Sequence, residues 1–171
     1  MNRAQLIIAP RLERRRGVPA ASAPASDAKP AVVARAEAAR LAESESRLRS
    51  LADTMPALLW MVDAKRSHLF KNQAWLDFFG VEHGAASDHV WDAALHPEDR
   101  DRVLALYRDV QFRQVAYRID CRVRRKDGAW RWIEEIGTPR FGPNGFEGYT
   151  GASVDVTERR DGEERVRLLM R

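Results

Sequence analysis

The clearest pattern of apolar and polar positions lies between residues 116 and 156, where alternation predicts three antiparallel strands. The first strand covers about 116–125 and the second about 129–138. The Lys-Asp-Gly sequence between them predicts a hairpin, because Asp-Gly between alternating runs favours a two-residue primed turn. The third strand covers about 146–156, after the Gly-Pro-Asn-Gly turn at 142–145.

Two shorter apolar runs and a short helix precede these strands. Residues 58–62 and 68–70 have the length of strands and predict two more of them. Asn72 is suited to cap the start of a helix, and Gly80 is suited to its left-handed end. Residues 81–96 show no clear period, and we expect loops and short helical turns there.

The best helical pattern begins at Pro97, because proline is favoured in the first turn of a helix. The apolar residues that follow at i, i+3, i+4 and i+7 are Val103, Leu106, Tyr107 and Val110. Two strands, several short helices and a three-stranded meander, in this order, predict an α+β domain. We expect one antiparallel sheet with the helices gathered on one of its faces.

The residues before the first strand form two segments of different composition. Residues 1–34 contain a basic stretch and then Ala, Pro and Ser, and we predict a disordered leader because they bury too little apolar surface. Residues 35–55 are rich in helix formers, and Pro56 ends the predicted helix. Its apolar residues include Leu41, Leu48 and Leu51. This helix either lies on its own domain or pairs with a second copy, and both alternatives stay open.

Length and charge narrow the classes of function. The 171 residues fit one domain with flanking segments. Of 29 basic and 25 acidic residues, 6 and 2 lie in residues 1–30, so the remainder holds 23 of each and is neutral. We therefore interpret the basic segment as a solvated tail and predict no nucleic-acid partner.

The apolar runs are too short for a membrane segment. None approaches the roughly 20 residues that a membrane helix requires, so we predict no membrane span. The apolar patch near the first residue is also shorter than the core of a secretory leader, so we expect a cytoplasmic protein. The lone Cys121 fits a reducing compartment and cannot form an internal disulfide.

Five short motifs follow one another between residues 45 and 158. They are Asn72-Gln73-Ala74-Trp75, His96-Pro97-Glu98-Asp99-Arg100, Arg124-Arg125-Lys126-Asp127-Gly128, Arg131-Trp132-Ile133 and Asp155-Val156-Thr157-Glu158-Arg159-Arg160. In this order and spacing they resemble the PAS sensor domain, of the PAS fold-3 type with a closing PAC motif. The resemblance implies a five-stranded antiparallel sheet around a small pocket, with the PAS domain over 56–157. It also implies flanking helices that carry signals and commonly dimerise, which predicts a homodimer and a C-terminal signalling helix over 158–171.

The resemblance also gives roles to two residues of the closing motif. In the family, the aspartate and threonine of this motif couple the last strand to the outgoing helix, and that role falls to Asp155 and Thr157. The alternative is that Thr157 caps the helix and Asp155 satisfies a turn, and both descriptions can hold together.

The family register turns one face of the strands toward the pocket. The predicted pocket residues, two of them on the first short helix, are Trp75, Phe79, Ile119, Cys121, Val123, Ile133, Glu135, Tyr149 and Ser153. Glu135 is either a polar contact of a ligand or the partner of Arg131. The residues turned outward are Trp130, Trp132 and Ile136. We expect a flanking helix or a second subunit to cover them.

The final residues, 163–171, resemble the helix that leads into the phosphoacceptor motif of HWE-type sensor histidine kinases. The chain stops before a phosphoacceptor histidine and has no ATP-binding domain. The resemblance therefore implies the sensory part of such a kinase, with an output kinase-type domain or another protein as its partner.

Residues with catalytic or ligating chemistry are few. The histidines, His68, His83, His89 and His96, lack the spacing of metal ligands, so we predict no metal site. Haem-binding relatives take their ligand from the long helix, where 98–112 holds no histidine, and flavin-adduct relatives need a helical cysteine. Cys121 lies on a predicted strand, so we interpret it as a packing residue, with a redox role as the alternative. Neither an acid–base pair nor a phosphate loop is present, and we predict no cofactor and no enzymatic activity.

Together these patterns predict a sensory PAS module of a signal-transduction protein. It would be the input part of a two-component sensor histidine kinase and could hold a small-molecule ligand. One alternative is an interaction module without a ligand, which predicts a filled interior. Another is a haem or flavin sensor, which predicts visible absorbance of the purified protein.

Overall fold

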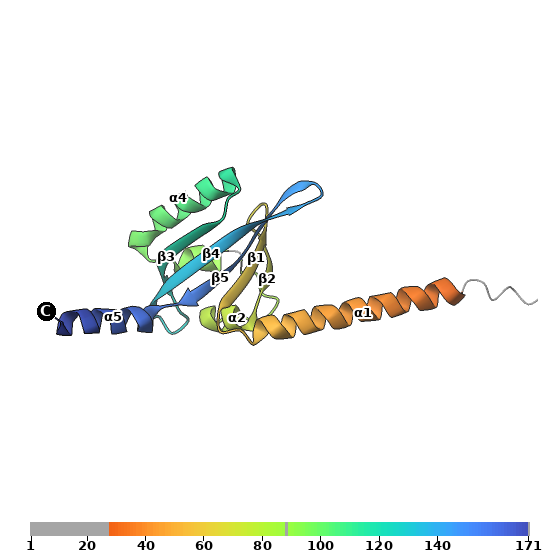
Figure 1. Cartoon of the computed structure of the whole chain (residues 1–171), viewed down its shortest axis with the longest axis horizontal. Helices are drawn as coiled ribbons and strands as arrows, with labels where there is room; N and C mark the ends of the chain where they lie inside the picture. Colours follow the sequence, from red (N-terminus) through yellow and green to blue (C-terminus); the bar gives the residue numbers. More distant parts are fainter. Residues whose placement is uncertain (1–27, 88, 171) are drawn as a thin grey trace, which may run out of the picture. The chain divides into compact units, whose positions relative to one another are not determined.

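The computed structural model describes residues 28–87 and 89–170, and its centre is a five-stranded antiparallel sheet (Figure 1). The strands are β1 (Leu58–Asp63), β2 (His68–Lys71), β3 (Tyr117–Arg124), β4 (Trp130–Gly142) and β5 (Gly145–Asp155), in the spatial order β2-β1-β5-β4-β3. The helices are α1 (Ala28–Asp53), α2 (Gln73–Phe79), α3 (Val90–Ala94), α4 (Pro97–Arg113) and α5 (Thr157–Leu169). The predicted α+β class and the five-stranded antiparallel sheet are confirmed.

The hydrophobic core lies between one face of the sheet and helices α2, α3 and α4. Along β3, Ile119, Cys121 and Val123 are buried, while the residues between them are more exposed. Val103 and Tyr107 of α4 are buried in the same core. The shared face predicted from period-two alternation, and its inward direction implied by the family register, are therefore confirmed for this strand.

The predicted capping residues hold two of these helices in place. The Asn72 side chain accepts a hydrogen bond from the backbone N–H of Trp75 (3.2 Å), and Gly80 ends α2 in the left-handed region with φ of +69°. At the start of α4, Nδ1 of His96 accepts a hydrogen bond from the N–H of Glu98 (3.2 Å). His96 thus has a structural role at the start of this helix.

The hairpin between β3 and β4 has a three-residue loop, so the predicted two-residue primed turn is wrong. The N–H of Arg125 donates to the carbonyl of Ala129, and the N–H of Gly128 donates to the carbonyl of Arg125. Within residues 126–128 only Gly128 has a positive φ, +87°. This is the arrangement of a tight turn followed by a left-handed residue, which is common in three-residue hairpins. The Asp-Gly pair indicated the hairpin because glycine takes that one left-handed position.

The hairpin between β4 and β5 is longer than predicted. Its strands pair up to Gly142 opposite Gly145, whereas the sequence placed the end of β4 at 138. The predicted turn at 142–145 is confirmed, and the rings of Phe141 and Phe146 make an edge contact beside it, with centroids 5.9 Å apart. Residue pairs between β4 and β5 therefore extend up to the turn, and side-chain contacts such as this one stabilise the pairing.

The described part of the chain divides into two units, on either side of a boundary between residues 40 and 41 within α1. Helix α1 begins at Ala28, before the predicted start at residue 35, because Ala31 and Ala34 are strong helix formers. The rest of the predicted leader, residues 1–27, lies outside the described residues.

In the second unit, the end of α1 is fastened to the sheet domain by Asn72, whose Nδ2 donates to the carbonyl of Ala52 (2.8 Å). Leu41, Leu48 and Leu51 of this helix are 63%, 64% and 63% exposed. The alternative in which these leucines lie on their own domain is therefore wrong. Within residues 28–87 and 89–170, no helix is both long and apolar enough to cross a bilayer.

Candidate functional site

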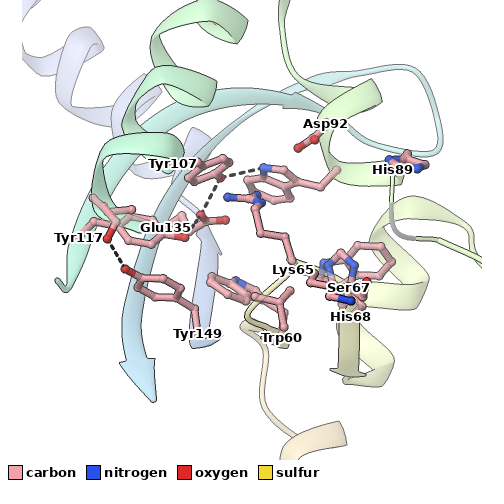
Figure 2. Close-up of a pocket in the computed structure, with 15 residues that line it drawn as sticks. Trp60, Lys65, Ser67, His68, His89, Asp92, Tyr107, Tyr117, Glu135 and Tyr149 are labelled. Atoms are coloured by element: carbon pink, nitrogen blue, oxygen red, sulfur yellow. Dashed lines mark hydrogen bonds between the residues drawn. The ribbon is translucent and has the colours of Figure 1, made fainter. Parts of the chain in front are cut away.

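A cavity of about 390 Å³ lies between the inner face of the sheet and the covering helices (Figure 2). All five strands and helices α2, α3 and α4 contribute to its lining, which includes Trp60, Val62, His68, Trp75, Trp91, Tyr107, Tyr117, Glu135 and Tyr149. Its volume falls near the lower end of the range for small-molecule sites, about 300–1,000 Å³. The cavity therefore suits a small metabolite.

Glu135 is the most unusual residue of this lining, because a carboxylate is buried there without a basic partner in hydrogen-bonding contact. Its Oε1 accepts hydrogen bonds from the hydroxyls of Tyr107 (2.7 Å) and Tyr117 (2.7 Å), and its Oε2 accepts one from Ser153 (3.2 Å). Figure 2 shows Glu135 between the two tyrosines. Burial raises the pKa of Glu135, and the three hydrogen bonds offset part of that increase. The tyrosines remain protonated donors, because burial and the neighbouring Glu135 raise the pKa of each.

Two tryptophans extend this hydrogen-bond network toward the helices and the central strands. The indole N–H of Trp91, on α3, donates to the Tyr107 hydroxyl (2.9 Å). The indole N–H of Trp60, on β1, donates to the Ser153 hydroxyl (3.2 Å). The network therefore joins β1, β3, β4, β5, α3 and α4 at one buried carboxylate, so a change at Glu135 bears on every one of these elements.

Charged residues from the turn between β1 and β2 line the other side of the cavity. Lys65 and Arg66 belong to this turn, and Asp92, on α3, also lines the cavity. The guanidinium carbon of Arg66 lies 4.1 Å from the centre of the Tyr107 ring. Arg66 has a φ of +69°, a left-handed conformation that is uncommon outside glycine.

Three of the nine predicted pocket residues, Trp75, Glu135 and Tyr149, line this cavity. The six that do not line it are Phe79, Ile119, Cys121, Val123, Ile133 and Ser153. The first five of these pack in or against the hydrophobic core. Ser153 is hydrogen-bonded to Glu135. Alternation assigns a side chain to a face of the sheet, but helices cover much of that face and fill the space above it. The predicted pocket was therefore larger than the cavity.

Most of the residues that give the cavity its polarity were not predicted from the sequence. Tyr107 was assigned only to the apolar side of a helix, and Tyr117 only to a strand face. Arg66 lies in a turn with no period. One pattern could have found the tyrosines, since a buried carboxylate needs donors and both lie on elements facing it.

The predicted alternative of a Glu135–Arg131 pair is wrong. Nε of Arg131 donates instead to Oδ2 of Asp155 (2.6 Å). This contact belongs to the junction between the sheet and α5, on the outgoing side of β5. Glu135 instead accepts its hydrogen bonds from Tyr107, Tyr117 and Ser153.

Asp155 and Thr157 meet at that junction. The Thr157 hydroxyl donates to Oδ1 of Asp155 (2.7 Å) and accepts from the backbone N–H of Trp132 (2.8 Å). Oδ1 of Asp155 also accepts from the N–H of Thr157 (3.0 Å), so Asp155 satisfies a turn as the alternative proposed. Thr157 is not the cap of α5, because Val156 occupies that position without a side-chain cap. The two side chains therefore tie β4, β5 and α5 together.

The outward residues are covered unequally. The guanidinium carbons of Arg122 and Arg160 lie 5.3 Å and 4.2 Å from the centre of the Trp132 ring, and Arg160 comes from α5. Trp130 is 42% exposed, with one edge contact to His96, and Ile136 is 45% exposed. A flanking helix thus reaches Trp132, whereas cover of the other two by a second subunit stays a prediction.

The cysteine and histidines occupy different surroundings. Cys121 is 0% exposed, and burial raises the pKa of its thiol to about 12, which fits a packing residue. His68 and His89 line the cavity. Among residues 28–87 and 89–170, no group of three or more His, Cys, Asp or Glu side chains is placed to hold a metal ion.

Known proteins with related sequences share most of this domain. Residues 68–152 match the family of the PAS fold, and this range runs from β2 into β5. An uncharacterised protein of Sinorhizobium fredii, y4lL, is 34% identical over 130 residues. That match covers 75% of this chain and 16% of y4lL, so the chain spans a small part of the relative's length.

Solved structures agree with the sequence match. The PAS domain of a protein from Colwellia psychrerythraea is 19% identical with a TM-score of 0.56, covering 66% of this chain and 97% of that one. A sensory box histidine kinase/response regulator from Burkholderia thailandensis is 28% identical with a TM-score of 0.52, covering 71% and 90%. With the observed strand order, these matches assign the sheet and its covering helices to one family: this chain carries a PAS domain.

Proposed function

We propose that this chain is the sensory module of a signal-transduction protein and that a small molecule in the cavity changes the state of α5. The pairing of β4 with β5 carries the proposal. Glu135 lies opposite Ser153, and the next inward pair is Ile133 opposite Asp155. Ser153 donates to the cavity carboxylate, and Asp155 holds Thr157 at the start of α5. A shift of β5 at Ser153 therefore reaches Asp155 over about 7 Å of one strand.

A ligand can bias α5 only if it binds two states of the domain with different affinity. The hydrogen bonds around Glu135 supply a basis for two such states, because a ligand that binds Oε2 shares this oxygen with the Ser153 hydroxyl. The cavity favours this function over the alternative of an interaction module, which predicted a filled interior.

We also propose that α5 passes its state to a histidine-kinase-type output domain. The likeness to the sensory box histidine kinase/response regulator of Burkholderia thailandensis supports this proposal. The resemblance of residues 163–171 to the lead-in of an HWE-type kinase core points in the same direction.

We propose further that the module works as a homodimer. The exposed Leu41 and Leu48 are seven residues apart, with Leu51 on the same helix, which is the spacing of a helix pair. Light scattering of the purified chain should give twice the chain mass, and Leu48→Glu should shift it to the monomer. An unchanged mass for Leu48→Glu would contradict this arrangement.

The test of the proposed function joins residues 28–170 in register to the phosphoacceptor and catalytic core of a sensor kinase. Ser153→Ala removes the donor to Glu135 and the acceptor of Trp60, so autophosphorylation of this chimera should change several-fold. Ser46→Ala, at an exposed position of α1, is the matched control and should leave the rate unchanged. Native mass spectrometry should also find a small molecule released on unfolding. A folded Ser153→Ala chimera with the parent rate would contradict the proposed route.

A further inference from the structure

Around Glu135 the hydrogen-bond donors are already used within the protein. The hydroxyl and indole donors there are Trp60, Trp91, Tyr107, Tyr117 and Tyr149, and each donates to another protein group. The Ser153 hydroxyl likewise donates to the carboxylate itself. A ligand that reaches this end of the cavity therefore meets few free donors next to Glu135.

What this end still offers is an acceptor beside aromatic rings. A carboxylate has about four acceptor positions, and three of those on Glu135 are filled, which leaves one on Oε2. The rings of Tyr107 and Tyr149 each lie 5.7 Å from the ring of Tyr117 in edge contacts. An acceptor oxygen beside aromatic rings suits an ammonium group, which has three donors and is attracted to ring faces. Such a cation would also favour the ionised carboxylate, against the burial that raises its pKa.

The turn between β1 and β2 has the opposite character. The Arg66 guanidinium contacts the Tyr107 ring, but within the described residues it donates no hydrogen bond to a protein acceptor. Lys65 lines the cavity beside it. A guanidinium with free donors is the group that best holds a carboxylate, because two parallel N–H bonds match its two oxygens.

The positive charge of Arg66 and the carboxylate of Glu135 both contact the side chain of Tyr107. Arg66 lies over the ring of Tyr107, and Glu135 accepts from its hydroxyl, so a short ligand can reach both. We propose that the cavity binds a free α-amino acid, with its ammonium group at Glu135 and its carboxylate at Arg66. This inference rests on the proposed function, since it names the ligand class of the same cavity. A simple amine would leave the arginine unpaired, and a simple carboxylic acid would leave the deep acceptor unpaired, so neither matches the site as well.

The test is calorimetric titration of the full chain with each of the twenty proteinogenic amino acids. The tightest binder is then compared with its amine, which lacks the carboxylate, and with its carboxylic acid, which lacks the amino group. Each analogue should bind at least about tenfold more weakly, because each loses a charged hydrogen bond. Arg66→Met should weaken the amino acid by at least about the same factor, while Arg108→Met, at an exposed position of α4, should not.

The outcomes separate this inference from the proposed function. Equal binding of an analogue, unchanged binding by Arg66→Met, or no binding by any amino acid would overturn the ligand class. In those cases, release of a small molecule other than an amino acid in native mass spectrometry would still support the proposed sensory function. If no small molecule occupies the cavity at all, both proposals fail. Circular dichroism of the two arginine variants checks that each remains folded.

Discussion

Replacing Thr157 with valine should loosen α5 from the sheet. The change keeps the shape of the side chain and removes its hydrogen bonds to Asp155 and to the N–H of Trp132. A bond to a carboxylate contributes about 1.5–3 kcal/mol and a neutral bond about 0.5–1.5 kcal/mol. The Asp155 side chain is partly exposed to water, which competes for these groups, so we take the lower ends of both ranges. The expected loss is about 2 kcal/mol of unfolding free energy.

Two measurements check this prediction. Denaturant unfolding gives the total loss, and hydrogen exchange of the α5 amides shows where it occurs. A local loss of about 2 kcal/mol should speed exchange in α5 by about thirtyfold. Thr138→Val is the matched control, because Thr138 is exposed on β4 and has no side-chain hydrogen bond in the part of the chain described. If both variants unfold and exchange alike, the junction does not depend on the threonine hydroxyl and our reasoning is refuted.

Two further substitutions test the packing around the sheet. Hydrogen bonds from Arg122 lower the pKa of Asp99 to about 2, below its ordinary value of 3.8. Asp99 therefore stabilises the fold fully above about pH 4, and this contribution is lost as the pH falls toward 2. Asp99→Asn should therefore cost at most about 2 kcal/mol at neutral pH and flatten the acid dependence of urea unfolding, whereas an unchanged slope would count against the ion pair. A β-carbon at Gly137 would overlap the Tyr117 ring, so Gly137→Ala should cost about 1–3 kcal/mol in thermal unfolding. Gly162→Ala in α5 meets no atom and should be neutral or stabilising, and equal effects of the two would contradict the clash.

The faces of the sheet could be predicted because side chains alternate along a strand with a period of two. This rule put Ile119, Cys121 and Val123 on one face, and the family register turned that face inward and Ile136 outward, as observed. Capping chemistry was equally local, so Asn72 could be assigned from the sequence. The start of α1 and the turn at 126–128 could not, because several backbone conformations suit the same residues there.

The cavity was only partly predictable, because its position depends on where side chains from separate helices stop filling the space above the sheet. Glu135 stood out as a charged residue on an inward face. Its true partners were distant in sequence, with Tyr107 on α4 and Tyr117 at the start of β3. Arg131 is nearer in sequence, but its guanidinium donates to Asp155 at the end of β5.

Cys121 makes the protein convenient to interrogate by thiol chemistry. It is the one cysteine of the chain, and its burial and raised pKa keep the reactive thiolate scarce. Alkylating reagents should modify Cys121 only when the domain opens, so the labelling rate measures how often the interior is transiently exposed. For the same reason, a cysteine introduced on α5 could be labelled with a fluorophore or spin probe while the buried Cys121 remains unlabelled.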